Sequence, residues 1–151
     1  MRIYLDASAL NRPFDDHTVP RNRLEAEAVL VILHGVERGR LDLVSSSVLE
    51  YENRMNPFAD RREYVATYLG LARTFVRSGR ALLDRAREIE GTGRLAPLDA
   101  LHLASAERAK AEWFITCDDD VLKRARSNKL ALPLKVDTPI AFVAARRRGD
   151  G

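Results

Sequence analysis

The chain has 151 residues, of which 46% are hydrophobic and 31% are charged. This length suits one domain with one core, and no apolar run reaches the roughly 20 residues that a membrane span needs. We expect no secretory signal, because the short apolar run after Arg2 ends at Asp6. The single cysteine, Cys117, excludes an internal disulfide and fits a reducing cytoplasm.

The net charge is +3, from 25 basic and 22 acidic residues, which gives a weak attraction to polyanions. Most basic residues are arginines, whose planar side chains can grip phosphate oxygens with two hydrogen bonds. They gather in the middle of the chain and near its end, at Arg61, Arg62, Arg73, Arg77, Arg80, Arg85, Arg87 and Arg146 to Arg148. We predict one domain over residues 1–145 and a disordered basic tail over residues 146–151.

The first part of the chain predicts two strands separated by a helix. The strands are expected over Arg2–Leu5 and Leu41–Ser45. The helix is expected from about residue 22 to residue 38, where apolar residues such as Leu24 and Val31 recur at helical spacing.

Two capping boxes predict the next helices. Ser47 with Glu50 matches the first, so a helix is expected to begin at Ser47. Asp60 with Glu63 matches the second, and its helix is expected to run on until near Gly79.

The second half predicts three helices and two strands. A helix is expected from about residue 81 to residue 90, followed by a turn at Gly91–Gly93, and a further helix runs from Pro97 to about residue 110. The strands are expected over Trp113–Thr116 and Leu134–Val136, with a short helix between them. Strands that alternate with helices imply a parallel sheet covered on both faces, so the predicted fold class is a three-layer α/β/α sandwich.

Two acids directly follow predicted strands. Asp6 follows the first strand, and Asp118 follows the strand over Trp113–Thr116. Each residue alone is also typical of a helix N-cap. In open α/β sheets, however, ligands bind beyond the carboxyl ends of the strands, so two acids at this edge indicate a site.

Glu50 and Glu52 lie about 200° apart around a helix, so they cannot both face one site. Glu50 already has a structural role in the predicted capping box. Glu52 has no such role, and we assign the functional acid to Glu52, with Glu50 as the alternative.

Asp99 lies in the first turn of a predicted helix, where the helix dipole favours an acid. The residues after it are mostly small and apolar, which indicates a largely buried helix. A buried carboxylate must be paired, protonated or bound to a cation. His102 shares roughly the same helix face, and we interpret it as a structural histidine outside the catalytic set.

Carboxylates from four distant segments suit Mg²⁺ or Mn²⁺, because crowded negative charges need a cation and these ions prefer oxygen ligands. Such an ion can activate water for phosphodiester hydrolysis. A zinc enzyme is disfavoured, because the three histidines lack ligand spacing. A phospho-aspartate phosphohydrolase is also disfavoured, because the residue two positions after Asp6 is Ser8 and not an acid.

Four motifs of the chain resemble the PIN-domain family, in particular the VapC-type toxin ribonucleases of toxin–antitoxin pairs. They occur in the family's order and spacing between Ile3 and about Val143: Tyr4-Leu5-Asp6-Ala7-Ser8 followed by Asn11 to Asp16, Ser47 to Glu52, Leu98 to Ala104, and Phe114 to Asp118.

The resemblance implies a PIN-like fold and a ribonuclease that depends on Mg²⁺ or Mn²⁺. It implies that the metal-binding, catalytic acids are Asp6, Glu52, Asp99 and Asp118. Ser8 and Thr116 would support them, and Asp120 or Asp119 would add an outer acid. The family also implies an RNA substrate, a homodimer and a small antitoxin that covers the site. The alternative is a PIN-fold module that binds RNA or protein without cutting.

Overall fold

The computed structural model describes residues 1–127 and 129–149. Five parallel strands form one sheet in the order β3-β2-β1-β4-β5. The strands are β1 (Arg2–Leu5), β2 (Asp42–Ser46), β3 (Thr74–Val76), β4 (Trp113–Ile115) and β5 (Lys135–Asp137).

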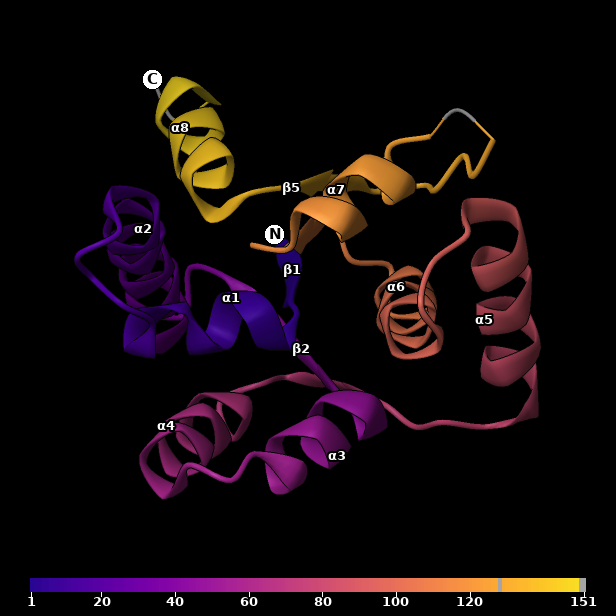
Figure 1. The fold of residues 1–151 in the computed structure, drawn as a ribbon, viewed down its shortest axis with the longest axis horizontal. Helices are drawn as coiled ribbons and strands as arrows, with labels where there is room; N and C mark the ends of the chain where they lie inside the picture. Colours follow the sequence, from indigo (N-terminus) through magenta and orange to yellow (C-terminus); the bar gives the residue numbers. More distant parts are fainter. Residues whose placement is uncertain (128, 150–151) are drawn as a thin grey trace.

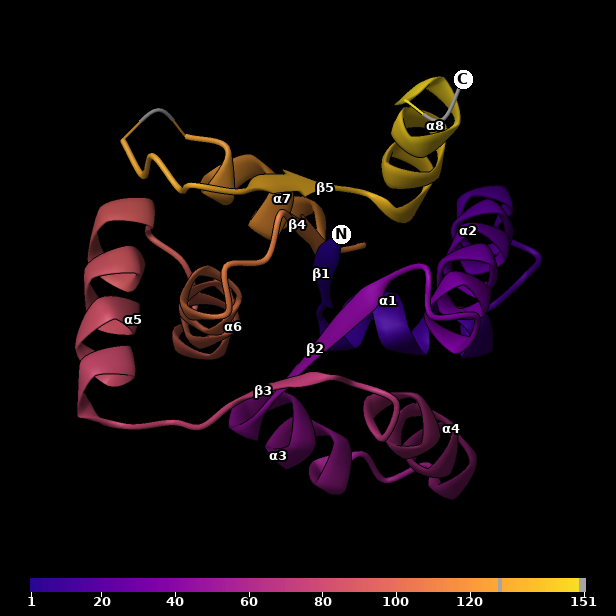
Figure 2. The ribbon, with the colours of Figure 1, turned by 180° about the vertical axis from the view of Figure 1, so that it is seen from behind.

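Helices cover both faces of this sheet, which confirms the predicted three-layer α/β/α class. One layer contains α1, α2 and α8, and α5 with α6 forms the opposite layer (Figure 1). Figure 2 shows α3 and α4 beside the β3 end of the sheet. The helices are α1 (Ala7–Asn11), α2 (Pro20–Glu37), α3 (Ser47–Met55), α4 (Ala59–Leu69), α5 (Arg80–Gly93), α6 (Pro97–Arg108), α7 (Asp119–Ala125) and α8 (Pro139–Gly149), with a 3₁₀ helix η1 (Arg12–Phe14) after α1.

The central strands form the middle of the core. Ile3, Tyr4 and Leu5 of β1 have no exposed surface, because helices cover β1 from both sides. The ring of Tyr4 stacks on that of Phe114 in β4, with centroids 5.3 Å apart. Among the described residues, no helix is long and apolar enough to cross a membrane.

The buried face of α2 differs from the predicted apolar repeat. Leu24 and Val31 are 51% and 58% exposed, respectively. The helix instead packs inward through a neighbouring stripe, which contains Ala26, Val29, Ile32, Leu33 and Val36. Apolar residues occupy most of the helix circumference, so spacing alone could not identify the stripe that faces the sheet.

Neither capping box forms as predicted. Ser46, and not Ser47, caps α3, because its Oγ accepts the backbone N–H of Leu49 at 3.2 Å. Glu50 is therefore one position too far along for the capping-box contact, and its side chain is exposed. Helix α4 begins at Ala59, after a Phe58 N-cap with no side-chain hydrogen bond.

The strand β3 was missed, because the predicted helix was extended across it. The helix α4 ends at Leu69, and β3 pairs with β2 as a three-residue edge strand. A strand this short, with Arg77 directly after it, carries too weak an alternation to be detected. The expected turn at Gly91–Gly93 is instead the end of α5, which stops at a left-handed Arg94 with φ 54°.

The helix α8 was also not predicted, and it includes part of the C-terminal segment that was expected to be disordered. Residues 146–149 continue this helix and do not form the expected disordered tail, while residues 150–151 lie outside the described residues. Phe142 of α8 is fully buried and meets Trp113 edge to face, with centroids 5.1 Å apart.

Candidate active site

The candidate site lies at the carboxyl edge of the sheet. Asp6 directly follows β1, and Asp118 lies three residues past the end of the neighbouring β4. The chain passes from β1 to β2 on one side and later reaches β4 on the other side, so β1 is the point where the strand order reverses. Ligands of doubly wound folds bind at such a point.

Asp6 is a buried carboxylate with three donors. Its Oδ1 accepts the hydroxyl of Ser8 at 2.6 Å and the backbone N–H of Ala9 at 3.0 Å, so it also caps α1. Its Oδ2 accepts the hydroxyl of Thr116 at 2.5 Å. Burial raises the pKa of Asp6, while the hydroxyls of Ser8 and Thr116 lower it in part.

Ser8 and Thr116 also fix the segment after β4. The Ser8 hydroxyl accepts the backbone N–H of Cys117 at 3.0 Å, and the Thr116 hydroxyl accepts that of Asp118 at 3.1 Å. The two hydroxyls lie 3.2 Å apart. Both residues therefore hold Asp6 and the backbone around Asp118 in one arrangement.

A buried ion-pair network supports the same segment from α2. Glu25 is only 1% exposed, and its Oε1 lies 3.2 Å from Arg12 and 3.1 Å from Arg21. Both arginines also donate to the carbonyl oxygen of Cys117 at 3.3 Å. A buried carboxylate needs such partners, and here the pairing ties α2 to the backbone beside Asp118.

Asp99 interacts electrostatically with the other three predicted acids. It lies half-buried in the first turn of α6. Its pKa is raised to about 6, first by burial and then by the negative charges of Asp118 and Asp6. Glu52 raises this pKa further. The four predicted acids are therefore close enough for their charges to interact.

Glu52 projects from α3 and meets a buried histidine. Its Oε1 lies 2.7 Å from Nε2 of His102, and Nδ1 of His102 lies 2.6 Å from the Tyr4 hydroxyl. The Tyr4 hydroxyl lies 2.8 Å from Oγ of Ser46, which accepts the N–H of Leu49. An ionised Glu52 can only accept, so Nε2 carries a proton and a neutral ring accepts from Tyr4 at Nδ1. Every member of this chain then has a partner.

Sequence reasoning missed the contact of His102 with Glu52. The sequence shows that His102 lies three residues after Asp99 on a largely buried helix. Its partner Glu52, however, comes from α3, 50 positions away in the sequence. Such a pairing depends on how α3 and α6 pack, and no local pattern encodes it.

The other candidate acids point elsewhere. Glu50 is exposed on α3. Asp119 is exposed and pairs with Arg21 at 2.7 Å, and Asp120 is exposed and pairs with Arg124 at 2.8 Å. The structure thus gathers Asp6, Glu52, Asp99 and Asp118 but does not bring the outer acids into this group.

The donor chemistry of the four acids fits a hard divalent cation, because their oxygens are the ligands that Mg²⁺ and Mn²⁺ accept. Burial and the charges of Asp118 and Asp6 raise the pKa of Asp99, and a cation bound nearby would favour the ionised carboxylate. Over residues 1–127 and 129–149, however, no three His, Cys, Asp or Glu side chains are already arranged to hold a metal ion. The carboxylates share a region, therefore, but do not form a finished coordination shell.

The family model described as PIN domain matches residues 3–127. The chain belongs to the PIN-domain family. PIN domains are generally nucleases, so this chain carries a nuclease-type module. No protein of curated function matches it significantly.

Among solved structures, the chain is similar to the crystal structure of PAE2754 from Pyrobaculum aerophilum. The two share 16% sequence identity with a TM-score of 0.57, over 99% of this chain and 90% of that one. At this identity, the likeness supports the fold alone.

Proposed function

We propose that this PIN-domain protein is an endoribonuclease that uses Mg²⁺ or Mn²⁺ to hydrolyse RNA phosphodiester bonds. The observation that carries the proposal is the placement of Asp6, directly after β1, and Asp118, after the neighbouring β4, at the same carboxyl edge of the sheet. Asp99 lies close enough for both charges to raise its pKa. Crowded acids at a ligand-binding edge are costly, and a bound cation relieves that cost.

In this proposal, Asp6, Glu52, Asp99 and Asp118 hold the ion. A bound divalent ion lowers the pKa of a water molecule and neutralises charge on the phosphoryl group. The protein contributes orientation: Ser8 and Thr116 fix the Asp6 carboxylate. Asp120 and Asp119 would act only from outside, because each is paired with an arginine.

The toxin role rests on the motif resemblance to VapC-type ribonucleases, as do the antitoxin partner and the homodimer. RNA as substrate agrees with the net charge of +3 and the many arginines. The single cysteine, Cys117, is buried, and burial raises its pKa to about 12, so it is an unreactive thiol. This fits the proposed cytoplasmic location.

Cleavage of unstructured and hairpin RNA by the purified chain tests the proposal. We expect cleavage with Mg²⁺ or Mn²⁺, loss of cleavage with EDTA, and recovery when Mn²⁺ is added in excess. Asp6→Asn and Asp99→Asn should abolish cleavage, while Glu27→Gln on the exposed side of α2 should not change it. If RNA binds but is cut with neither metal, the chain is a non-catalytic binding module.

A further inference from the structure

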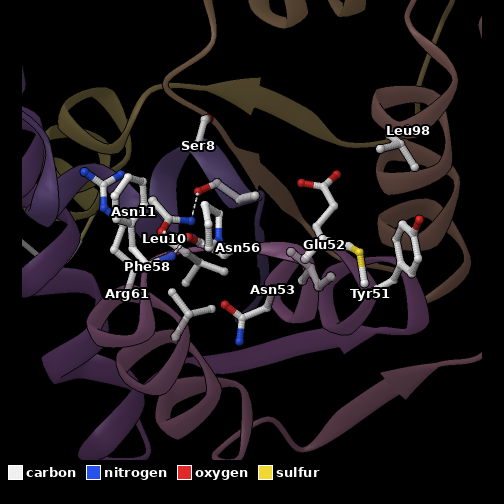
Figure 3. A pocket seen from close by; sticks show the side chains of 15 residues that line it. Ser8, Leu10, Asn11, Tyr51, Glu52, Asn53, Asn56, Phe58, Arg61 and Leu98 are labelled. Atoms are coloured by element: carbon white, nitrogen blue, oxygen red, sulfur yellow. Dashed lines mark hydrogen bonds between the residues drawn. The ribbon is translucent and has the colours of Figure 1, made fainter.

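A hollow of about 640 Å³ adjoins the candidate active site between α1, α3 and the connector to α4 (Figure 3). Ser8 and Glu52 form part of its wall, so it opens directly onto the carboxylate group. Most of the remaining wall is apolar, with Leu10, Leu49, Met55, Phe58, Val65 and Leu98. This volume is within the range of small-ligand pockets.

Phe58 is an exposed aromatic ring at one end of this hollow (Figure 3). It is 61% exposed. The guanidinium of Arg61 lies 5.2 Å from the centroid of its ring. Arg61 is itself held by the carbonyl oxygen of Phe14 at 3.0 Å and by Asp15 at 3.3 Å. The ring therefore has a fixed cation against it while most of its surface stays open.

The connector that carries Phe58 is fixed by side-chain hydrogen bonds. Asn56 accepts the backbone N–H of Phe58 at 3.0 Å and donates to Asn11 at 3.2 Å. Arg62 donates to the carbonyl oxygen of Asn56 at 2.8 Å. A platform fixed in advance loses little conformational entropy when a ligand stacks on it.

We propose that this hollow holds an unpaired nucleobase stacked on Phe58, next to the phosphodiester that lies at the carboxylate group. The inference rests on the proposed function and names the substrate class of the same site. Aromatic stacking with a nearby arginine is how proteins hold bases of single strands. An open aromatic ring with a guanidinium 5.2 Å from its centroid favours a nucleobase as the occupant. The presence of Ser8 and Glu52 in the same wall places that base beside the carboxylate group.

A double-mutant cycle between protein and RNA tests the contact. Steady-state cleavage is measured for wild type and Phe58→Ala, on one single-stranded oligonucleotide and on versions with an abasic residue at each position around the cut. Stacking on one base is worth about 1–3 kcal/mol, so Phe58→Ala should raise KM by about 5-fold to 150-fold with kcat within about 2-fold. One abasic position should raise KM equally in wild type and have no effect in Phe58→Ala.

Two variants separate stacking from exposure or folding. Phe75→Ala removes another exposed phenylalanine, on β3 and outside the hollow, and should leave KM unchanged. Phe58→Tyr keeps a ring and should retain the wild-type KM.

The inference is overturned if wild type cleaves RNA and Phe58→Ala behaves like Phe75→Ala, or if the two losses in the cycle simply add. A Phe58→Ala variant that loses only binding of a protein partner overturns it as well. Wild type that neither binds nor cleaves RNA contradicts the proposed function itself, which is a different result.

Discussion

Nε2 of His102 lies 2.7 Å from Oε1 of Glu52, and the other ring nitrogen of His102 is bound by Tyr4. Through this contact, His102 on α6 fixes the orientation of the Glu52 carboxylate on α3. When a group that orients a metal ligand by a hydrogen bond is removed, metal affinity or activity commonly falls by about 10–100-fold.

His102→Gln should therefore weaken Mn²⁺ binding by about 10-fold or more, because Glu52 loses the donor that orients it. Isothermal titration with Mn²⁺ measures this directly, without relying on cleavage. Tyr4→Phe, which removes only the hydroxyl behind the ring, should have a smaller effect in the same direction. A folded His102→Gln protein that binds Mn²⁺ as wild type does would show that the contact is purely structural.

Glu52→Gln should reduce kcat on RNA by about 100-fold or more, since its carboxylate interacts with Asp99 at the candidate site. Glu50→Gln is the matched control on the same helix and should stay within about 2-fold of wild type, because Glu50 is exposed. Rates on one RNA under identical Mn²⁺ conditions decide between them. The opposite ranking would reverse the assignment of the second acid.

Local patterns account for part of these assignments. Asp6 and Asp118 were predicted because each follows a hydrophobic strand, and the structure places both at the carboxyl edge of the sheet. The choice of Glu52 over Glu50 used a capping box that does not form, since Ser46 caps α3. The geometric part of that argument survives, because the two side chains do point in different directions.

Other features depend on contacts between distant segments, so no window of sequence reveals them. The strand β3 exists because its three residues pair with β2. The buried face of α2 is selected by the elements that pack on it, mainly η1 and α8, and Leu24 and Val31 stay exposed. The hydrogen-bond partners of His102 come from β1 and α3, so its role could be assigned only from the folded structure.

Asp99→Asn should stabilise the metal-free protein above pH 6. A carboxyl pKa raised to about 6 means that the folded chain binds this proton more tightly than the unfolded chain. Wild-type stability from this group is therefore fully present below the ordinary aspartate pKa of 3.8 and is lost as pH rises through about 6. Asparagine removes the dependence, and partial exposure limits the gain to about 1–2 kcal/mol.

Urea unfolding with EDTA at several pH values between 4 and 8 measures this difference. The two proteins should converge near pH 4 and separate as the pH increases. A constant difference at every pH would mean that Asp99 carries no electrostatic cost in the folded chain.

Glu25→Ala should destabilise the fold by about 1.5–3 kcal/mol, because Arg12 and Arg21 both lose a buried, charged hydrogen-bond acceptor. Arg12 keeps its ion pair with Asp15 in this variant, which limits the loss. Glu27→Ala, on the exposed side of the same helix, should change the free energy of unfolding by less than about 0.5 kcal/mol. Urea denaturation at pH 7 compares the two. Equal, small effects would show that the ion pairs of Glu25 do not hold the backbone beside Asp118.

The central claim is that Asp6, Glu52, Asp99 and Asp118 together bind the catalytic cation at one site. Anomalous diffraction from crystals grown with Mn²⁺ tests it most directly. We predict a strong manganese peak within coordination distance of carboxylate oxygens from at least three of these residues, and loss of that peak in Asp6→Asn crystals. A peak at another location, or four acids that stay apart with saturating Mn²⁺ present, would contradict the claim.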